Sequence, residues 1–435
     1  MPTPTDAPPV EPAATSADEE TGASAERADA AQMHAKQHSQ TARLVLGGLV
    51  LLLLGTTGAS LAIGAVDMTL GQVLAILADR VGVLLPWSFE SRQALVLTAI
   101  RLPRVLLAIG VGGGLAVAGA VMQGLFRNPL ADPSLIGVSS GAALAAVVTI
   151  VLGTTVLGAW TAWLGAFLLP IAAFAGGVAA TVVVYQLATS GGRTSVATML
   201  LAGIAINALA GAGTGLMIFI ADDDQLRDLT FWTLGSLGGA TWSQLAVVGP
   251  CLLGGMLAAP LMARPLNAML LGEGEALHLG IDTERVKKLV IALAAFVVGA
   301  AVAVSGVIGF VGLVVPHLLR LAVGPDHRVL IPGSALLGGA LLLGADLLSR
   351  TIVAPAELPL GIVTALLGAP DGGRCLSIAG CKRDLDDAGI RHWFRGKPSQ
   401  DGRDDDTSLK DGILDHNSLI CFSLEAAQST QIRIW

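Results

Sequence analysis

The sequence predicts an all-α, polytopic membrane protein with about ten transmembrane helices. Of its 435 residues, 53% are hydrophobic and only 14% are charged, whereas soluble domains carry roughly 25% charged residues. The mean hydropathy is +0.70. Residues 133–192 contain no Asp, Glu, Lys, Arg or His. Because one bilayer crossing takes about 20 apolar residues, this stretch has room for two crossings and a turn.

Ten apolar segments follow one another along the chain. They cover approximately residues 44–63, 105–126, 139–156, 163–187, 196–220, 242–262, 289–304, 313–323 and 330–348, and a last one begins near residue 358. A short amphipathic stretch at residues 70–83 lies in the loop after the first segment. Basic residues are distributed almost evenly between the two sets of loops, so the positive-inside rule alone does not orient the chain.

The two ends of the chain differ in composition from the membrane domain at residues 43–370. Residues 1–42 are rich in Ala, Pro, Thr, Ser and acidic residues, which predicts a disordered tail. The last apolar segment, residues 358–369, would form a helix of about 18 Å, against a hydrocarbon core of about 30 Å. Asp371 and Arg374 follow it. We therefore expect an incomplete tenth helix and a disordered, atypical tail at residues 371–435, produced by an out-of-frame or replaced ending. A functional regulatory tail is the alternative.

Motifs for enzymatic chemistry are missing from the sequence. It contains no G-x-x-x-x-G-K-[ST] phosphate loop, so the chain is not expected to hydrolyse ATP. The four cysteines and seven histidines are scattered and predict no metal site. Ionisable residues within the apolar segments usually mark ion pathways, but only Arg320, Asp346 and Arg350 are candidates. A secondary, ion-coupled transporter is thus a weaker alternative to other kinds of transport protein.

The most distinctive stretch is residues 101–145, which begins with RLPR and continues with AGAVMQGLFRNPLADPSLIGVSSGA at residues 118–142. Proline ends helices and restricts the preceding residue, so two X-Pro pairs predict a sharp turn between two spans. The turn residues are Asn128, Pro129, Asp132 and Pro133. This run of residues strongly resembles the FecCD-type permeases, the membrane subunits of ABC importers for iron-siderophores, haem and vitamin B12. The resemblance covers about residues 44–370 and implies the type II ABC importer permease fold, with the turn on the cytoplasmic side.

The resemblance also assigns roles to three groups of residues. The segment that would couple to the ATPase contains Gly272, Glu273, Glu275, Ala276, Leu279 and Gly280. The arginines that would dock the substrate-binding protein are Arg101, Arg104 and Arg350, for which anchoring to lipid headgroups is the alternative. The pathway or gate would contain Gly306, Gly309, Phe310, Gly312 and Pro316, where glycines interrupt regular helix. The family usually has proline where this chain has Val307, and we expect a structural role for His317 rather than haem ligation.

The function that the resemblance implies is that of a permease subunit in a binding-protein-dependent importer of an iron complex. Haem is the first choice of substrate, ferric siderophore the second, and vitamin B12 the alternative. The expected partners are a second permease copy (a homodimer or a paired permease), two ABC ATPase subunits, an extracytoplasmic binding protein and the lipid bilayer, with no nucleic acid. The chain would be a multi-pass protein of the plasma or inner membrane with a cytoplasmic N-terminus. It would bind no cofactor itself, because ATP is used by the partner subunit.

Overall fold

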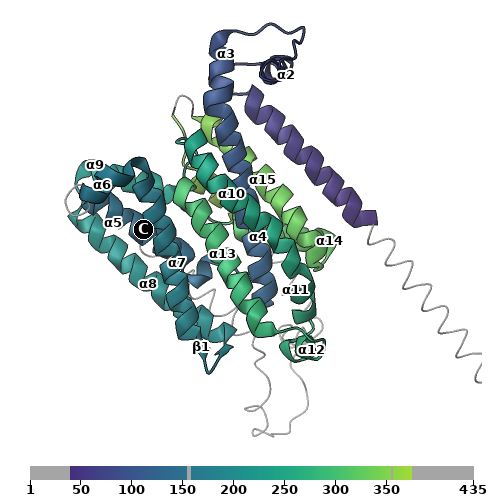
Figure 1. The fold of residues 1–435 in the computed structure, drawn as a ribbon, viewed down its shortest axis with the longest axis vertical. Coiled ribbons are helices and arrows are strands. Elements are labelled where there is room, and N and C mark those ends of the chain that lie inside the picture. Colours follow the sequence, from purple (N-terminus) through teal and green to yellow (C-terminus); the bar gives the residue numbers. More distant parts are fainter. Residues whose placement is uncertain (1–39, 154–157, 354–355, 375–435) are drawn as a thin grey trace, which may run out of the picture. The chain divides into compact units, whose positions relative to one another are not determined.

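The structure, a computed structural model, describes residues 40–153, 158–353 and 356–374. The predictions for residues 1–39 and 375–435 lie outside this part of the chain. The described residues up to Arg374 form one compact unit, in which helices of different lengths pack side by side (Figure 1). The only strands among the described residues are β1 (Thr189–Ser190) and β2 (Arg193–Thr194), which pair as a small antiparallel hairpin. The predicted all-α class is therefore confirmed.

Seven helices in the described part of the chain are long and apolar enough to cross a membrane. They are Gln40–Ala62, Ser91–Phe126, Gly165–Ala188, Val196–Ile220, Trp242–Met269, Thr283–Ser305 and His327–Ile352. Shorter apolar helices also occur among the described residues: α2 (Leu70–Asp79), α5 (Val138–Leu152) and α14 (Val311–Val323). The last helix, α16 (Leu360–Arg374), has 15 residues and is also below that length. Each of the ten predicted segments thus corresponds to a helix, and seven of these helices reach the length of a full crossing.

Several of the long helices consist of more than one consecutive helical element. The principal helices of the bundle are α4 (Leu102–Phe126), α7 (Leu168–Ala188), α8 (Val196–Ile220), α10 (Trp242–Ala258), α13 (Thr283–Ser305) and α15 (His327–Ile352). The shorter helical elements are α2 (Leu70–Asp79), α3 (Ser91–Leu95), the π-helix η1 (Val96–Arg101), η2 (Pro133–Ile136), α6 (Gly158–Leu164), η3 (Gly165–Phe167), α9 (Asp223–Leu234), η4 (Ala259–Met262), α11 (Ala263–Met269) and α12 (Glu273–His278). The amphipathic stretch after the first span is α2, which begins at a capping box made by Thr69 and Gln72.

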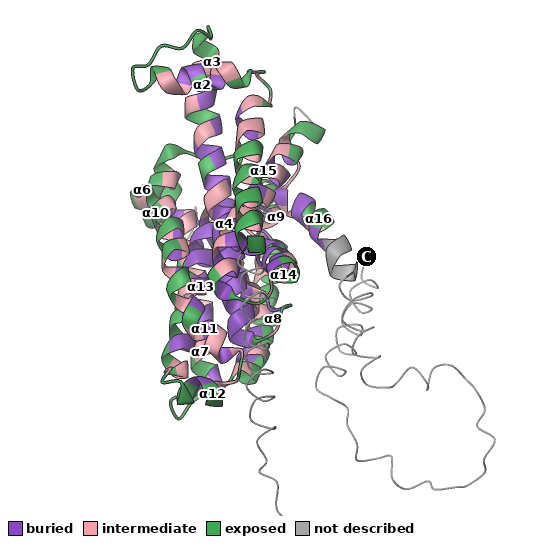
Figure 2. Ribbon diagram, turned by 90° about the vertical axis from the view of Figure 1, so that its right-hand side faces the viewer, coloured by how far each residue is buried: buried purple, intermediate pink, exposed green. Residues whose placement is uncertain are grey.

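Helix α4 lies in the middle of the bundle, and nearly all of its residues are buried (Figure 2). It packs against α10, α13, α14 and α15. Backbone touches backbone at two places, because a side chain at Gly112 would collide with the carbonyl of Gly338, and one at Gly119 with the carbonyl of Gly312. Small residues permit this close packing, which contributes to helix association in lipid.

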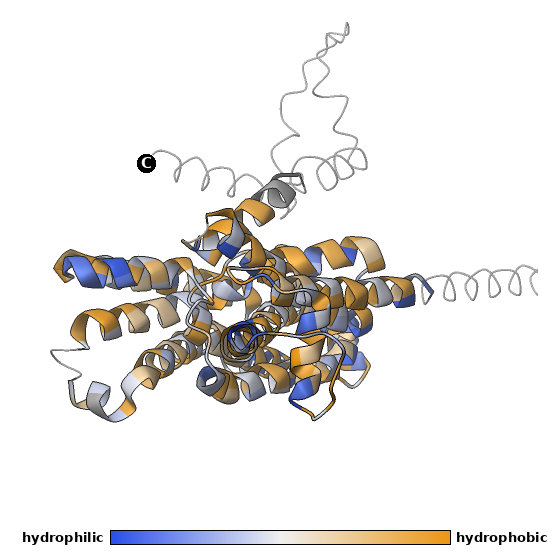
Figure 3. Cartoon of the chain, turned by 90° about the horizontal axis from the view of Figure 1, so that it is seen from above, coloured by the Kyte–Doolittle hydropathy of each residue, from blue (hydrophilic) through white to orange (hydrophobic). Residues whose placement is uncertain are grey.

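Large apolar side chains lie on the outside of the bundle instead. Leu201, Leu257 and Leu261 are each about 70% exposed, with values of 68%, 68% and 72%. Seen from above, hydrophobic residues line the flanks of the helices (Figure 3). This distribution suits a protein whose sides face hydrocarbon, where exposure of apolar surface carries no penalty.

The C-terminal helix is longer than predicted. The apolar segment was expected to end at Ala369, but α16 continues through Asp371 to Arg374. Its 15 residues span about 22 Å, which is still less than the roughly 30 Å hydrocarbon core. The expectation of a short last helix holds, whereas its predicted end point was wrong.

Candidate functional site

A cluster of charged side chains lies where α4 begins and α15 ends. This is the end of the bundle that carries α2 and α3 (Figure 1). Arg104 Nε and Nη2 donate to Asp346 Oδ1 at 2.9 and 2.8 Å. Its Nη1 and Nη2 also donate to the two carboxylate oxygens of Glu357 at 2.7 and 3.0 Å. The Asp346 side chain is fully buried, while that of Glu357 is 41% exposed. Charge-assisted bonds of this paired geometry fix the guanidinium in one orientation.

Two further arginines attach the first helix and its following loop to this cluster. Arg350 Nη2 donates to the carbonyl and hydroxyl oxygens of Ser60 at 2.6 Å, and its Nε lies 3.7 Å from Asp346 Oδ2. Arg101 donates to the backbone carbonyls of Leu61, Ala62 and Val66. Arg350, Asp346, Arg104 and Glu357 together form what we call the arginine cluster.

Arg101 and Arg104 are buried, whereas the predicted role in docking a binding protein would place them on the surface. Arg101 is 4% and Arg104 7% exposed, and both use their guanidinium groups on partners within the chain. A buried cation requires such partners because desolvation is expensive. In this structure, Arg80 and Arg92 near the same end are exposed instead. The docking role of Arg101, Arg104 and Arg350 therefore stays a prediction, and it requires rearrangement of the contacts seen here.

The loop between α15 and α16 carries Glu357, which is the most accessible member of the arginine cluster. The hydrogen bond from Arg104 lowers the pKa of Glu357 below its ordinary value of 4.5, and partial burial opposes that shift. Leu358 N, next to Glu357, donates to the carbonyl of Ser349 at 3.0 Å, and the Ser349 hydroxyl donates to the carbonyl of Leu358. The loop is thus held both by an ion pair and by backbone contacts.

At the opposite end of the bundle, the predicted coupling segment forms the short helix α12 (Figure 1). Glycines with positive φ flank it, Gly272 at +123° and Gly280 at +80°, and side chains other than glycine rarely adopt such angles. Ala276 is buried, whereas Leu277 and Leu279 are 63% and 64% exposed. The helix therefore presents apolar side chains outward, as a surface that contacts a partner would.

Lys287 anchors this segment to the rest of the protein. Its Nζ donates to Glu273 Oε2 at 2.8 Å, to Glu284 Oε1 at 3.0 Å and to the carbonyl of Thr194 at 2.9 Å. Lys287 is 2% exposed, while Glu275 is exposed. We call Lys287, Glu273, Glu284 and Thr194 the lysine cluster. Of the two acidic residues in the predicted coupling segment, Glu275 is exposed, whereas Glu273 is half-buried and bonded to Lys287.

The predicted gate lies where the chain leaves helical geometry between α13 and α14. Gly306 ends α13 with φ +67°, and Phe310 precedes α14 with φ +68°. Ser236 N donates to the carbonyl of Ser305 at 2.9 Å, and a side chain at Gly306 would collide with the carbonyl of Trp232. Protein therefore surrounds the first part of this irregular backbone, at Ser305 and Gly306, as the bilayer requires.

The other predicted gate residues have different surroundings. Gly312 touches α4 at Gly119, Pro316 is buried inside α14, and Gly309 is exposed with open space around it. The predicted turn at residues 128–133 is present, with Asn128 Oδ1 accepting from Leu130 N at 2.9 Å. Asp132 caps η2 by accepting from Ser134 N at 2.8 Å.

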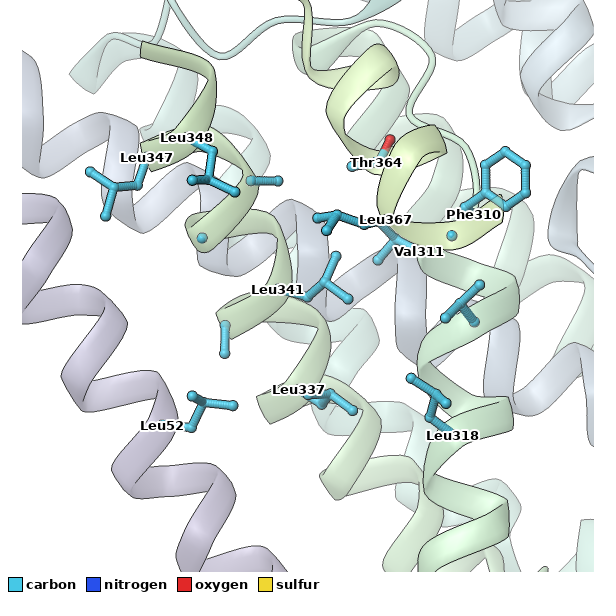
Figure 4. Close-up of a pocket in the computed structure, with 15 residues that line it drawn as sticks. Leu52, Phe310, Val311, Leu318, Leu337, Leu341, Leu347, Leu348, Thr364 and Leu367 are labelled. Carbon is cyan, nitrogen blue, oxygen red and sulfur yellow. The ribbon is translucent and has the colours of Figure 1, made fainter. Parts of the chain in front are cut away.

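Two cavities adjoin the gate. One, of about 480 Å³, lies between the first helix, α14, α15 and α16, and Thr364 is its only polar side chain (Figure 4). The other, of about 320 Å³, is more polar and includes Asp228, Ser236 and Ser305. No group of three or more His, Cys, Asp or Glu side chains suited to hold a metal ion occurs in the described ranges.

Comparison with known proteins settles the family. The model of the FecCD transport family matches residues 39–371, which include all of the long helices and the segments described above. The chain belongs to the FecCD transport family.

Several FecCD relatives are similar over most of their length. The hemin transport system permease protein HmuU of Yersinia pestis is 46% identical over 333 residues, which are 75% of this chain and 93% of that protein. The cobalamin import system permease protein BtuC of Halobacterium salinarum is 46% identical over 281 residues, 65% of this chain and 73% of its own. The vitamin B12 import system permease protein BtuC of Escherichia coli is 39% identical over 306 residues, 70% of this chain and 91% of its own.

A solved structure has the same fold. It is described as a metal-chelate type ABC transporter in an inward-facing conformation, and it superposes with a TM-score of 0.66 at 33% identity. The match covers 76% of this chain and 98% of the other. This FecCD chain is therefore a multi-pass inner-membrane permease of the metal-chelate type, the component of an ABC importer that works with an ATPase and a binding protein.

Proposed function

We propose that this protein is the permease subunit of an ABC importer for an iron complex, with haem as the first candidate and ferric siderophore as the second. The observation that carries the proposal is the 46% identity to a hemin permease over 93% of its length. The cobalamin permease of Halobacterium salinarum has the same 46% identity to this chain, but the alignment covers a smaller share of its length, 73%. Vitamin B12 is therefore the alternative substrate.

The pathway is proposed to lie between two copies of this chain. Helix α8 supports the idea, because its outer face carries small residues: among the described residues, a side chain at Gly211 or Gly215 would meet nothing within 4 Å. Such a Gly-xxx-Gly pair allows a second helix to approach closely. A homodimer in which α8 contributes to the contact is thus consistent with the surface of the single chain.

The proposed orientation places α12 and the N-terminus in the cytoplasm. The helix Gln40–Ala62 ends beside α2 and α3, so its start is directed away from that end, toward the side of the bundle that carries α12 (Figure 1). The exposed leucines of α12 would enter a cleft on the ATPase, and Gly272, Glu273, Glu275, Ala276, Leu279 and Gly280 would form the coupling segment. The chain itself would bind no cofactor, because ATP would be bound and hydrolysed by the partner subunit.

The experiment is reconstitution of the full importer in proteoliposomes with its cognate ATPase and binding protein. Uptake of radiolabelled haem, a ferric siderophore and cobalamin is measured with and without ATP inside the vesicles. We expect ATP-dependent uptake of haem. Uptake of cobalamin alone would favour the alternative, and ATP-independent uptake that follows a proton gradient would identify a secondary transporter.

A further inference from the structure

A groove of about 550 Å³ runs between α7 and α13, and one of its ends lies next to the lysine cluster. Apolar side chains make up most of its lining, including Val178, Val182, Ile291 and Ala295. The hydroxyl of Thr181, which also lines it, already donates to the carbonyl of Gly177 at 3.0 Å. Its volume falls within the roughly 300–1,000 Å³ of ligand sites in proteins.

Two polar groups for which the described residues provide no partner lie at one end of the groove. Tyr185, the only tyrosine of the chain, lines it three residues before the end of α7. Its hydroxyl is buried and has no hydrogen-bond partner among the described residues. Lys288, near the start of α13, also lines the groove, is exposed and forms no ion pair in the described part of the chain. A buried hydroxyl without a partner is costly, so a ligand that accepts its hydrogen bond would be favoured.

Two aromatic rings lie at the other end of the groove. Phe174 and Phe296 both line it, and their rings meet edge to face with centroids 5.9 Å apart. From the polar end to these rings the helix rises by eight residue steps on α13 and eleven on α7, or about 12 to 17 Å. One leaflet of the hydrocarbon core is about 15 Å deep. The groove therefore has the length of a single leaflet.

We propose that this groove binds an acyl chain of an anionic phospholipid, with the lipid phosphate held by Lys288 and Tyr185. The phosphate would accept hydrogen bonds from the ammonium and from the unpaired hydroxyl, while the chain lies against the apolar walls. A zwitterionic lipid would gain less, because basic residues near the membrane surface attract net negative charge. The proposed orientation puts the site in the cytoplasmic leaflet. Only this choice of leaflet rests on the proposed function.

The test is a lipid titration of the delipidated full-length protein, followed by native mass spectrometry. The probes are phosphatidylglycerol and phosphatidylcholine with the same acyl chains. We expect the wild-type protein to bind phosphatidylglycerol several-fold more tightly. Lys288→Ala should weaken that binding roughly five-fold and leave phosphatidylcholine unchanged, Tyr185→Phe should weaken it by a smaller factor, and Lys288→Arg should restore it.

Matched variants separate the groove from general surface charge. Arg328→Ala removes an exposed cation at the start of α15, close to α11 and outside the groove, and should not change lipid binding. Ala292→Phe places a ring in the groove and should weaken both lipids, whereas Ala246→Phe on the exposed face of α10 should weaken neither.

Three results would overturn the proposal. One is an equal effect of Lys288→Ala and Arg328→Ala. Another is displacement of phosphatidylglycerol by glycerol phosphate as effectively as by intact lipid, which would indicate a site for free phosphates. The third is efficient disulfide formation between two copies through Ala292→Cys, which would show that a second chain covers the groove. Since none of these measurements uses transport, they are independent of whether the importer carries haem.

Discussion

The arginine cluster and the lysine cluster are built alike but differ in their access to water. In each, one buried cation bridges two carboxylates from different parts of the chain. In the arginine cluster the central carboxylate, Asp346, is fully buried. In the lysine cluster the side chains of Glu273 and Glu284 are 39% and 26% exposed. Water can therefore replace protein contacts in the lysine cluster, whereas in the arginine cluster only Glu357 has that freedom.

The difference indicates two mechanical roles. Arg104 makes paired hydrogen bonds to both of its partners, which fixes the relation between α4, α15 and the loop before α16. Lys287 holds α12 and the β-hairpin through single bonds from a rotatable ammonium. A cation of this kind can exchange partners more easily than a guanidinium. We expect the lysine cluster to yield during transport and the arginine cluster to keep its core pair.

The largest effect is expected from Asp346→Ala. The replacement leaves Arg104 and Arg350 buried with fewer partners, and removal of one member of a buried pair costs about 3–5 kcal/mol. The midpoint of thermal unfolding in detergent should fall strongly. Asp228→Ala, at an exposed carboxylate, serves as the control. The double variant Arg104→Met with Asp346→Leu should recover part of the loss, and a double variant as unstable as the single one would contradict this account.

Lys287→Met should cost less, about 1–2 kcal/mol, because both carboxylates can recover water when the ammonium is lost. Lys288→Met is the neighbouring control, since Lys288 is exposed and outside the cluster. The measurement is the midpoint of thermal unfolding of Lys287→Met, Lys288→Met and the wild type under the same conditions. If Lys287→Met were as damaging as Asp346→Ala, the proposed contrast in hydration would be wrong.

Charge reversal on α12 should separate anchoring from coupling. Glu275→Lys changes an exposed side chain and should shift stability by less than about 0.5 kcal/mol, yet uncouple ATP hydrolysis from transport in proteoliposomes. Glu273→Lys places a second cation beside Lys287 and should also lower stability. Unchanged transport by both variants would exclude α12 from coupling.

The smallest effect concerns the pH dependence of Glu357. Because the pKa of Glu357 is lowered in the folded protein, its contribution to stability is complete at neutral pH and is lost as the pH falls below about 4.5. The partial exposure of its side chain limits this contribution to less than about 1 kcal/mol. The unfolding midpoint should thus fall slightly more between pH 7 and pH 4 in the wild type than in Glu357→Gln. An identical fall in both proteins would show that the ion pair contributes nothing.

Much of the fold could be predicted because each membrane-spanning helix appears in the sequence as a continuous run of apolar residues. The predicted segment 196–220 coincides with α8 (Val196–Ile220), and 105–126 falls within α4. The glycine interruption after Ser305 was also predicted, since Gly306 has no helical continuation. The last helix was misjudged at its end because Asp371 was assumed to stop it, although a helix near its terminus tolerates a charged residue.

The interactions of the charged residues could not be predicted in the same way. Arg104 finds its partners 242 and 253 residues later in the chain, and no local pattern records that contact. Lys287 was overlooked although Glu284 lies three residues before it, because Lys288 beside it looks equivalent in sequence. Only packing shows that one lysine faces inward and the other faces the groove between α7 and α13.

The distance in sequence between Arg104 and its partners has a consequence for how the protein is made. Ribosomes add roughly 5–20 residues per second, so about 10 to 50 s pass between synthesis of Arg104 and synthesis of Glu357. Throughout that interval the newly inserted α4 carries a guanidinium that has no carboxylate to meet it. The insertion machinery must therefore shelter this helix, or leave its end at the membrane surface, until α15 arrives. The last third of the chain thus completes the environment of a helix made near the beginning.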